Sequence, residues 1–396
     1  MKKFKLNNLI LLILVLGLSL FGLVAIYSAS SYSASVNYGD AFFFVKKQAV
    51  GLVIGIFAII FFTLFDYHKF YKLRWWIIGI SVLLLVLVFI PEIGKSNYGA
   101  NRWIGFGGFS IQSSEVAKFG FVIFASCYMS KNYEKMKTFK GMLPVLLSGG
   151  LICFLVLLEP NLSVTLCIGC VLLLLLFIGG VKTKYFVIFL CLGLALLPIL
   201  IIVEPYRLKR LVAFINPWAN PLEEGFQLIQ SLYSLGAGGF FGVGLFNSRQ
   251  KYLFLPFSES DFILSIIGEE FGFFGILILC LVYIAIIVQG IKIAFNASDR
   301  MGAYLAFGIT SIIGVQMLIN FAVVTGSIPP TGIPLPFVSA GGSSLVVFLS
   351  SIGILLNISN NSKFKFDMRK FAINYKSNKR VKTSIKWSIL EVFYGI

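Results

Sequence analysis

Charged residues are scarce in this chain. Only 12% of its 396 residues are Asp, Glu, Lys or Arg, while 58% are hydrophobic. Soluble globular domains carry about 25% charged residues and lack so many long apolar runs. The composition therefore excludes an ordinary soluble protein and predicts a protein that crosses the membrane many times.

Chemistry based on cysteine or histidine is not expected either. All six cysteines fall inside predicted helices, which argues against disulfides and thiol chemistry. Cys167 and Cys170 have the C-x-x-C spacing of redox and metal sites, but in a lipid-embedded helix we interpret them as small packing residues. The one histidine, His68, lies in a basic loop and has no predicted role.

Ten apolar segments are long enough, or nearly so, to cross a hydrocarbon core about 30 Å thick. They comprise residues 9–28, 49–65, 75–90, 116–129, 143–158, 162–178, 185–203, 263–288, 302–324 and 345–356. The fourth and tenth are short, and we expect them to begin earlier, near Ile111 and Gly341. The first could be a signal peptide, but it exceeds the 7–15 apolar residues of such signals. We predict an all-α polytopic fold of about ten transmembrane helices, with a large extracytoplasmic loop between the seventh and eighth.

Acidic residues number 16 against 33 basic ones, and the formal net charge is +17. If the N-terminus is cytoplasmic, most Lys and Arg residues fall on the cytoplasmic side, as the positive-inside rule requires. We therefore predict that both termini are cytoplasmic. A transmembrane domain would cover residues 1–358, with its extracytoplasmic loop at 204–262, and a basic cytoplasmic tail would cover 359–396. Aromatic and apolar residues among the tail's cations favour contact with membrane lipids over nucleic acid.

A long polar segment rich in Gly and Pro lies between apolar runs at residues 216–275. A loop of this length is usually functional or disordered, and its many aromatic residues argue against disorder. The segment contains Asp261, directly before an apolar run. A carboxyl group beside apolar surface has a raised proton affinity and can act as a general base. Asp is equally suited to be a helix N-cap, so both interpretations stand.

Ionisable residues inside spans are further candidates, because each costs about 2.5–3.5 kcal/mol at the bilayer centre. Glu115 and Lys118 share one helical face and could neutralise each other, as a functional or a structural pair. Glu159 lies in a tight outward turn. Its role is either functional or that of a residue that ends a helix. Glu269 and Glu270 lie within the eighth span, and we expect one of them to pair across the bundle, with Lys118 or an arginine.

Cations on the outer side run against the positive-inside trend and need a compensating anion. These cations are Arg207, Lys209, Arg210, Arg249 and Lys251. A pyrophosphate or lipid headgroup would compensate them, and unspecific headgroup contact is the alternative. Arg102 and Trp103 combine a cation with a ring that could stack on a sugar, although Trp is also an ordinary interfacial anchor. Residues 328–344 are too rich in Pro and Gly for a helix and should line a cavity or be covered by protein.

Four of these segments together resemble the SEDS family of polytopic peptidoglycan glycosyltransferases (shape, elongation, division and sporulation). In chain order they read NRWIGFGGFSIQSSEVAKF from Asn101, NPWANPLEEGFQLIQSLYSLGAGGFFGVGLFNSRQKYLFLP from Asn216, SDFILSIIGEEFGFFG from Ser260 and IPPTGIPLPFVSAGGSS from Ile328. The runs NSRQK, NPW and TGIPLPF resemble the FtsW and SpoVE branch more than RodA.

The chain also departs from the family pattern. Ser113 stands where the family usually has Pro, Ala340 where it has Tyr, and Asn161 where it has Asp after an acid and Pro. The residues directly before Asp261 differ as well. These departures affect the branch assignment and the details of substrate recognition, but the acid that matches the family's essential aspartate, Asp261, is present.

The resemblance implies a peptidoglycan glycosyltransferase that polymerises lipid II into β-1,4 glycan strands, with inversion, at the outer face of the bacterial cytoplasmic membrane, for division or sporulation. Asp261 would be the catalytic base. Candidate substrate-binding residues are Arg102, Trp103, Glu115, Lys118, Arg207, Arg210, Gln250, Lys251 and Ser343. A divalent cation, Mg or Mn, is expected, with Glu115 or Asp261 as its ligand.

The implied partners are lipid II, polyprenyl-pyrophosphate-linked glycan, a class B penicillin-binding protein that crosslinks the strand, and divisome or sporulation proteins. Gly51 and Gly55 form a small-xxx-small motif in the second span, which suits packing inside the protein or against a partner helix.

Two other functions also fit ten helices around a polar centre. A lipid II flippase or transporter would carry polar residues at mid-depth in several spans, whereas here they gather at the outer edge. A non-catalytic scaffold for a transpeptidase would tolerate substitution of Asp261.

Overall fold

A computed structural model of the chain describes residues 6–91, 93–97, 100–106 and 109–362. Twelve α-helices make up most of this described part, and eight of them are long and apolar enough to cross a membrane. The eight are α1 (Leu6–Tyr38), α2 (Phe43–Leu64), α3 (Phe70–Leu87), α5 (Phe139–Leu158), α7 (Thr183–Ile202), α10 (Ile263–Asn296), α11 (Arg300–Val324) and α12 (Gly342–Asn361). The chain is therefore a multi-pass membrane protein.

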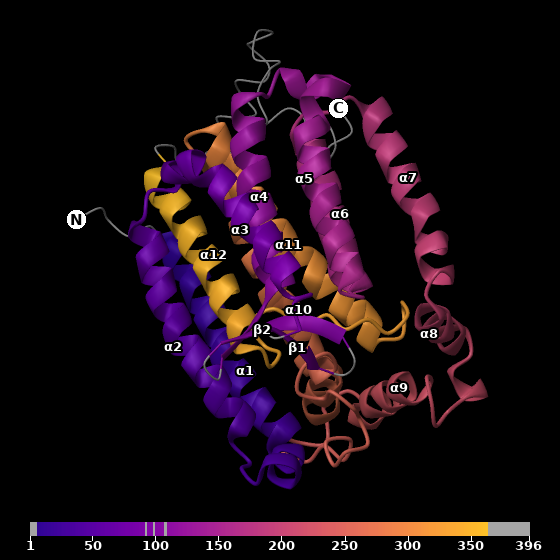
Figure 1. The fold of residues 1–396 in the computed structure, drawn as a ribbon. Helices are drawn as coiled ribbons and strands as arrows, with labels where there is room; N and C mark the ends of the chain where they lie inside the picture. The colour runs from indigo at the N-terminus through magenta and orange to yellow at the C-terminus, as the bar shows by residue number, and fades with distance from the viewer. Residues whose placement is uncertain (1–5, 92, 98–99, 107–108, 363–396) are drawn as a thin grey trace.

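Two further helices, α4 (Ser113–Lys131) and α6 (Leu162–Ile178), lie among these eight (Figure 1). They fall on the predicted fourth and sixth spans, although the number of membrane crossings stays a prediction. α11 packs against α4, α6, α10 and α12 and forms the centre of the bundle. None of the residues of α7 is buried, and this helix stands at the edge of the bundle in Figure 1.

The two ends of the bundle differ in structure. In Figure 1, α1 begins and α12 ends at the upper end, while the strands, α8 (Pro205–Ile215) and α9 (Phe226–Gly238) lie at the lower end. The predicted loop at 204–262 thus contains two helices and a short 3₁₀ turn, η3 (Pro217–Ala219).

Polar side chains begin several of the helices. Thr138 accepts a hydrogen bond from Gly141 N at the start of α5, Asn161 from Val164 N at the start of α6, and Asp299 from Gly302 N at the start of α11. Each side chain satisfies a backbone N–H that has no partner within its helix. Asn161, one departure from the family pattern, is therefore an N-cap, a role that Asp and Asn perform equally well.

Glycines allow α2 and α12 to approach closely. A methyl group placed on Gly51 would lie 2.8 Å from the backbone of Gly342, and one placed on Gly55 would lie 2.2 Å from the side chain of Leu349. Helices in lipid associate through such small residues because their backbones can then pack tightly. The motif at Gly51 and Gly55 thus packs inside the protein.

Some predicted boundaries need correction. The first outer segment holds a small antiparallel sheet of three strands, β1 (Gly94–Asn97), β2 (Ala100–Phe106) and β3 (Phe109–Gln112), in which Trp103 is paired with Gln112. α1 extends ten residues past the predicted end of the first span, to Tyr38. α12 ends at Asn361, five residues past the predicted end of the tenth span. The tail from residue 363 lies outside the described residues.

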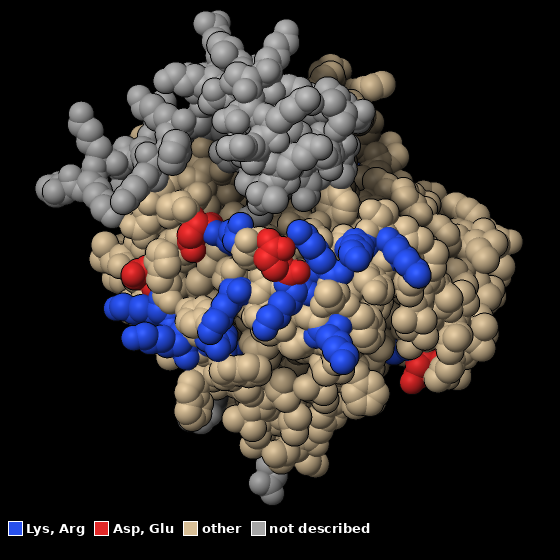
Figure 2. Space-filling view, turned by 90° about the horizontal axis from the view of Figure 1, so that it is seen from above, with Lys and Arg blue, Asp and Glu red and all other residues tan. Residues whose placement is uncertain are grey.

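Basic side chains gather at the upper end of the bundle. Figure 2 views this end and shows many Lys and Arg side chains around it, with few Asp and Glu. The elements here include η1 (Tyr67–Lys69), η2 (Lys135–Lys137) and the turn between α6 and α7. These segments were assigned to the cytoplasmic side by the positive-inside rule, and they lie together at the same end.

Candidate active site

Asp261 lies in the turn directly before α10. This helix begins at Ile263, its N-cap is Phe262, and no side chain caps it. Asp261 is therefore not the N-cap, which removes one of the two interpretations that the sequence left open. Its side chain is partly buried. A methyl group placed on Gly332 would lie 3.1 Å from Asp261 Oδ2, so the carboxyl lies directly against this glycine.

The Pro- and Gly-rich loop between α11 and α12 fixes the backbone on either side of Asp261. Ser339 Oγ donates to Ser260 O at 2.5 Å, and Ala340 N donates to Glu259 O at 2.9 Å. From α11, Asn320 Nδ2 donates to Asp261 O at 2.9 Å. This irregular loop is thus covered by protein, as its composition required, and it holds the turn that carries the carboxyl.

Two arginines from distant parts of the chain act on Asp261. Arg102, on β2, donates from Nε to Glu159 O at 3.1 Å and from Nη2 to Pro160 O at 2.6 Å. Arg210, on α8, donates from Nη1 to Pro330 O at 3.2 Å. Each guanidinium has five N–H donors, so both retain donors for an anion. The charges of both arginines therefore act on the Asp261 carboxyl.

The surroundings of Asp261 shift its proton affinity in opposite directions. Burial raises the pKa of Asp261 to about 6, Arg102 and Arg210 act to lower this pKa, and Glu259 raises it. Burial also raises the pKa of Glu259. A carboxyl with a pKa near 6 is largely ionised at neutral pH and still has a useful proton affinity, which is the property required of a general base.

Glu159 is fully buried in the turn between α5 and α6. Its Oε1 accepts a hydrogen bond from Ser113 Oγ at 2.8 Å, and its Oε2 has no hydrogen-bond partner in the described structure. Burial raises the pKa of Glu159 to about 8, against the lowering effects of Ser113 and Arg102. Glu159 is therefore mostly protonated at neutral pH and leaves the positive charge of Arg102 available to Asp261.

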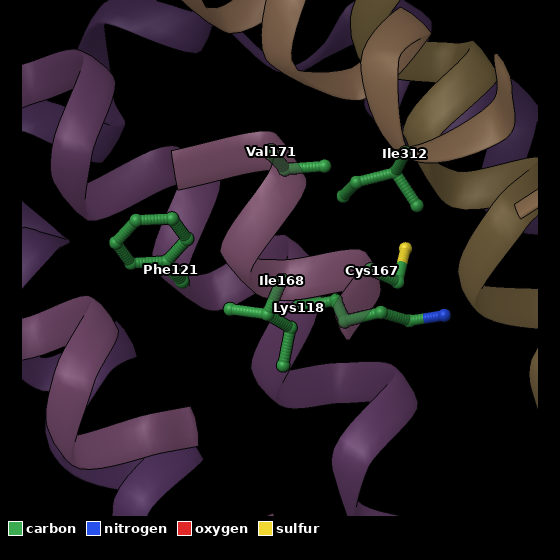
Figure 3. A pocket seen from close by; sticks show the side chains of 6 residues that line it. All are labelled: Lys118, Phe121, Cys167, Ile168, Val171 and Ile312. Atoms are coloured by element: carbon green, nitrogen blue, oxygen red, sulfur yellow. The ribbon is translucent and has the colours of Figure 1, made fainter. Parts of the chain in front are cut away.

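Glu115 and Lys118 form the ion pair that their spacing predicts. Lys118 Nζ lies 2.8 Å from Glu115 Oε1, and both side chains are only 1% exposed. The ammonium also donates to Gln316 Oε1 at 2.5 Å. Figure 3 shows the Lys118 side chain beside a gap too tight for water, lined also by Phe121, Cys167, Ile168, Val171 and Ile312. The ammonium is therefore enclosed by protein rather than open to a substrate.

The pairing expected for Glu269 and Glu270 differs in the structure. Glu270 lies 3.6 Å from Lys251 Nζ, not beside Lys118. Glu269 instead accepts from Ser248 Oγ at 2.5 Å and from Arg249 N at 2.9 Å. The two carboxylates thus compensate the outer-segment cation Lys251 and bind the backbone before it, which explains why this cation does not require an external anion.

The remaining predicted site residues are Gln250, Arg207, Trp103 and Ser343. Gln250 follows the segment held by Glu269, and its Oε1 is buried without a hydrogen-bond partner in the described structure. Arg207 donates to Leu200 O at 2.9 Å and so ties α8 to α7. Trp103 is partly buried beside Arg102 on β2, and Ser343 lies in the first turn of α12 with a buried Oγ that has no partner among the described residues.

Three polar residues near Asp261 were not predicted from the sequence. Gln316 and Asn320 are buried on α11, and Thr331 lies between Pro330 and Gly332 with its Oγ1 buried and unpartnered in the described part of the chain. The two amides had a recognisable signal, since polar residues one turn apart in an apolar span are rare and usually functional. Thr331 had none within the Pro- and Gly-rich segment.

A metal centre built by protein side chains alone is not found in the described residues, where no three His, Cys, Asp or Glu side chains group together. Asp261 and Glu259 are two acids of one turn, and Mg²⁺ commonly binds one or two carboxylates together with substrate phosphates. Both oxygens of Glu115 already accept hydrogen bonds, from Lys118 and Ser344. The donor set at Asp261 therefore suits a cation that arrives with a phosphorylated substrate.

The fold and the site together define a multi-pass helical membrane protein with a carboxyl and two arginines at one end of its bundle. The chain belongs to the FtsW, RodA and SpoVE family, described as cell cycle proteins, whose sequence profile matches residues 8–364. It is 38% identical over 364 residues to the probable peptidoglycan glycosyltransferase FtsW of Geobacter metallireducens, covering 92% of this chain and 97% of the relative. It is 40% identical over 363 residues to the stage V sporulation protein E of Bacillus subtilis, covering 90% of this chain and 98% of the relative.

Solved structures share this fold. A peptidoglycan synthase complex that coordinates polymerization and crosslinking contains a chain that matches with a TM-score of 0.74 and 25% identity, over 90% of this chain and 98% of that one. The rod shape determining protein RodA of Thermus thermophilus matches with a TM-score of 0.66 and 22% identity, over 90% of this chain and 97% of that one. The second match supports the fold alone.

Proposed function

We propose that the protein is a peptidoglycan glycosyltransferase that polymerises lipid II into β-1,4 glycan strands. The observation that carries this proposal is the carboxyl of Asp261, partly buried against Gly332 and influenced by both Arg102 and Arg210. A base beside two cations suits a reaction in which a hydroxyl loses a proton while a pyrophosphate leaves. The names of the FtsW relatives support the same activity.

Asp261 would act as the general base. The 4-hydroxyl of the lipid-linked acceptor sugar attacks the anomeric carbon of the donor, the bond from that carbon to the pyrophosphate oxygen breaks, and the hydroxyl proton passes to Asp261. The donor is α-linked and the product is β-linked, so the single displacement inverts the configuration. With its pKa raised to about 6 by burial, Asp261 is ionised and ready to accept this proton at neutral pH.

The leaving polyprenyl pyrophosphate needs charge neutralisation as the bond breaks. Arg102 and Arg210 can supply it, because each uses only part of its guanidinium to bind the backbone carbonyls of Glu159, Pro160 and Pro330. A divalent cation held by Asp261 or Glu259 would add positive charge at the same oxygens. Trp103, next to Arg102, would contact a sugar of the substrate.

We also infer the orientation and the partners. The basic end of the bundle in Figure 2 would face the cytoplasm. Asp261 would then lie at the outer face, and both termini would lie inside. The synthase complex among the structural relatives supports a crosslinking partner, which we expect to be a class B penicillin-binding protein. Division or sporulation proteins would recruit the pair.

The experiment that tests this function is the incubation of purified protein with lipid II in detergent, followed by gel separation of the glycan products. We expect chains of several sugars, and fewer or none in EDTA if a divalent cation is used. Detergent has no second leaflet, so a flippase would leave lipid II unchanged. A scaffold would give product only when its transpeptidase partner brings a polymerase of its own.

A further inference from the structure

Two buried amide side chains lie one helical turn apart on α11. Gln316 is 0% exposed and Asn320 is 1% exposed. Residues four positions apart lie on the same face of a helix, so both amides point toward the same neighbours. Burying an amide inside a span is unfavourable unless it forms hydrogen bonds, and the partners of these two amides show what they connect.

Asn320 connects the turn of Asp261 to the Pro- and Gly-rich loop. Its Nδ2 donates to Asp261 O and to Ile333 O, both at 2.9 Å. Since both partners are carbonyl oxygens, the nitrogen of the amide must face them. Its Oδ1 is then buried without a hydrogen-bond partner in the described structure. An unsatisfied buried acceptor lowers stability, so stability alone does not account for an amide at this position.

Gln316 makes the equivalent connection one turn deeper. Its Nε2 donates to Pro334 O at 2.9 Å, the residue after the one that Asn320 binds. Its Oε1 accepts from Lys118 Nζ at 2.5 Å, and Lys118 is paired with Glu115 at 2.8 Å. One continuous set of hydrogen bonds therefore runs from the buried ion pair to the backbone of the loop that faces Asp261.

We propose that Gln316 and Asn320 are positioning residues for Asp261. We call the two residues the amide ladder. The ladder fixes where the backbone of residues 333 and 334 lies along α11. It thereby sets the distance between Gly332 and the Asp261 carboxyl. It also gives the Glu115–Lys118 pair a role that needs no substrate contact, because the Lys118 ammonium holds the Gln316 amide in place. This inference rests on the proposed polymerase function.

The test compares lipid II polymerisation by Asn320→Leu, Gln316→Leu and a control, Thr310→Val. Thr310 is buried on the same helix, and its hydroxyl bonds Ala306 O within that helix. We expect kcat of both ladder variants to fall about 10- to 100-fold, because a displacement of about 1 Å at a reacting group has such an effect. KM for lipid II should stay within about twofold, since substrate contacts are unchanged. The control should match the wild type.

More conservative substitutions at the same two positions test the proposal if a leucine variant does not fold. Asn320→Asp has the same shape with fewer donors, and Gln316→Glu still accepts from Lys118 but does not donate to Pro334 O when ionised. Both should fold, as checked by thermal unfolding in detergent, and lose kcat like the leucine variants. Unchanged kcat in the folded variants, or a loss confined to KM, would overturn the ladder. If the wild type and Thr310→Val also make no glycan, the proposed function fails instead.

Discussion

At the scale of single residues, the behaviour of Asp261 depends on a balance between burial and charge. Burial raises its pKa to about 6, while Arg102 and Arg210 limit that rise. A base is active only when it is ionised, so the rate of polymerisation should fall as the pH drops through about 6. Removal of either positive charge should raise the pKa of Asp261 further and move this loss of rate to higher pH.

Two neighbours on α8 provide a matched pair for this prediction. Arg210 acts on Asp261, whereas Lys209 forms an exposed ion pair with Glu224 at 3.2 Å. In Arg210→Gln, the midpoint of the acid limb of the rate profile should rise by about half a pH unit or more. In Lys209→Gln, it should stay at the wild-type value. The measurement is the rate of lipid II polymerisation by the wild type and both variants between pH 5 and pH 8. A midpoint that moves equally in both variants, or downward in Arg210→Gln, would contradict the assigned electrostatics.

The sequence indicated candidate site residues but not their contacts. Asp261, Arg102 and Arg210 were recognisable because charged residues beside apolar runs are costly and seldom accidental. The sequence could not separate a base from an N-cap at Asp261, since both need an acid before a helix. Nor could it predict that Lys118 is enclosed, because its partner Gln316 lies 198 residues away along the chain.

At the scale of elements, α10 is not one regular helix. Gly272 has φ 67° and ψ −165°, which breaks the helix after its first turns. The break exposes backbone groups to residues 239–244: Val243 N donates to Glu269 O and Phe273 N donates to Gly239 O, both at 2.9 Å. The first turns of α10, which begin beside Asp261, are thereby joined to the segment after α9.

This break requires glycine. A methyl group on Gly272 would lie 2.4 Å from Gly242 N, and its positive φ is unfavourable for any residue with a side chain. We expect Gly272→Ala to lose about 2 kcal/mol or more of stability. Gly150→Ala, in regular helix α5 with open space around it, should be neutral or gain up to about 1 kcal/mol. Thermal unfolding of both variants in one detergent makes the comparison. Equal unfolding temperatures would show that the break is not needed.

Most helices of the bundle were predictable, whereas α8 and the strands were not. Long apolar runs place predicted spans within four residues of the ends of α5, α6, α7 and α11. The sheet of β1, β2 and β3 was missed because its strands are short and rich in Gly, Ser and Asn, and only the four residues of β3 alternate between apolar and polar in the way that marks a strand. The break in α10 was missed because Gly272 lies in an apolar run that suits a continuous helix.

At the scale of the whole molecule, charge is distributed unevenly between the two ends of the bundle. Basic residues gather at the end of the bundle that Figure 2 shows, whereas β2 and α8, which carry Arg102 and Arg210, lie near the other end in Figure 1. This separation follows from hydropathy and charge alone, so the sequence could predict it. The meeting of β2, α8 and the turn before α10 depends on tertiary packing, which no local pattern specifies.

The most direct measurement of the central claim is polymerisation of lipid II by purified Asp261→Asn beside the wild type. Asn has nearly the same size but cannot accept the hydroxyl proton, so the variant should fold and unfold at the wild-type temperature. We expect glycan chains from the wild type and none from Asp261→Asn. Chains of equal length and amount from both proteins would contradict the role of Asp261 as the base.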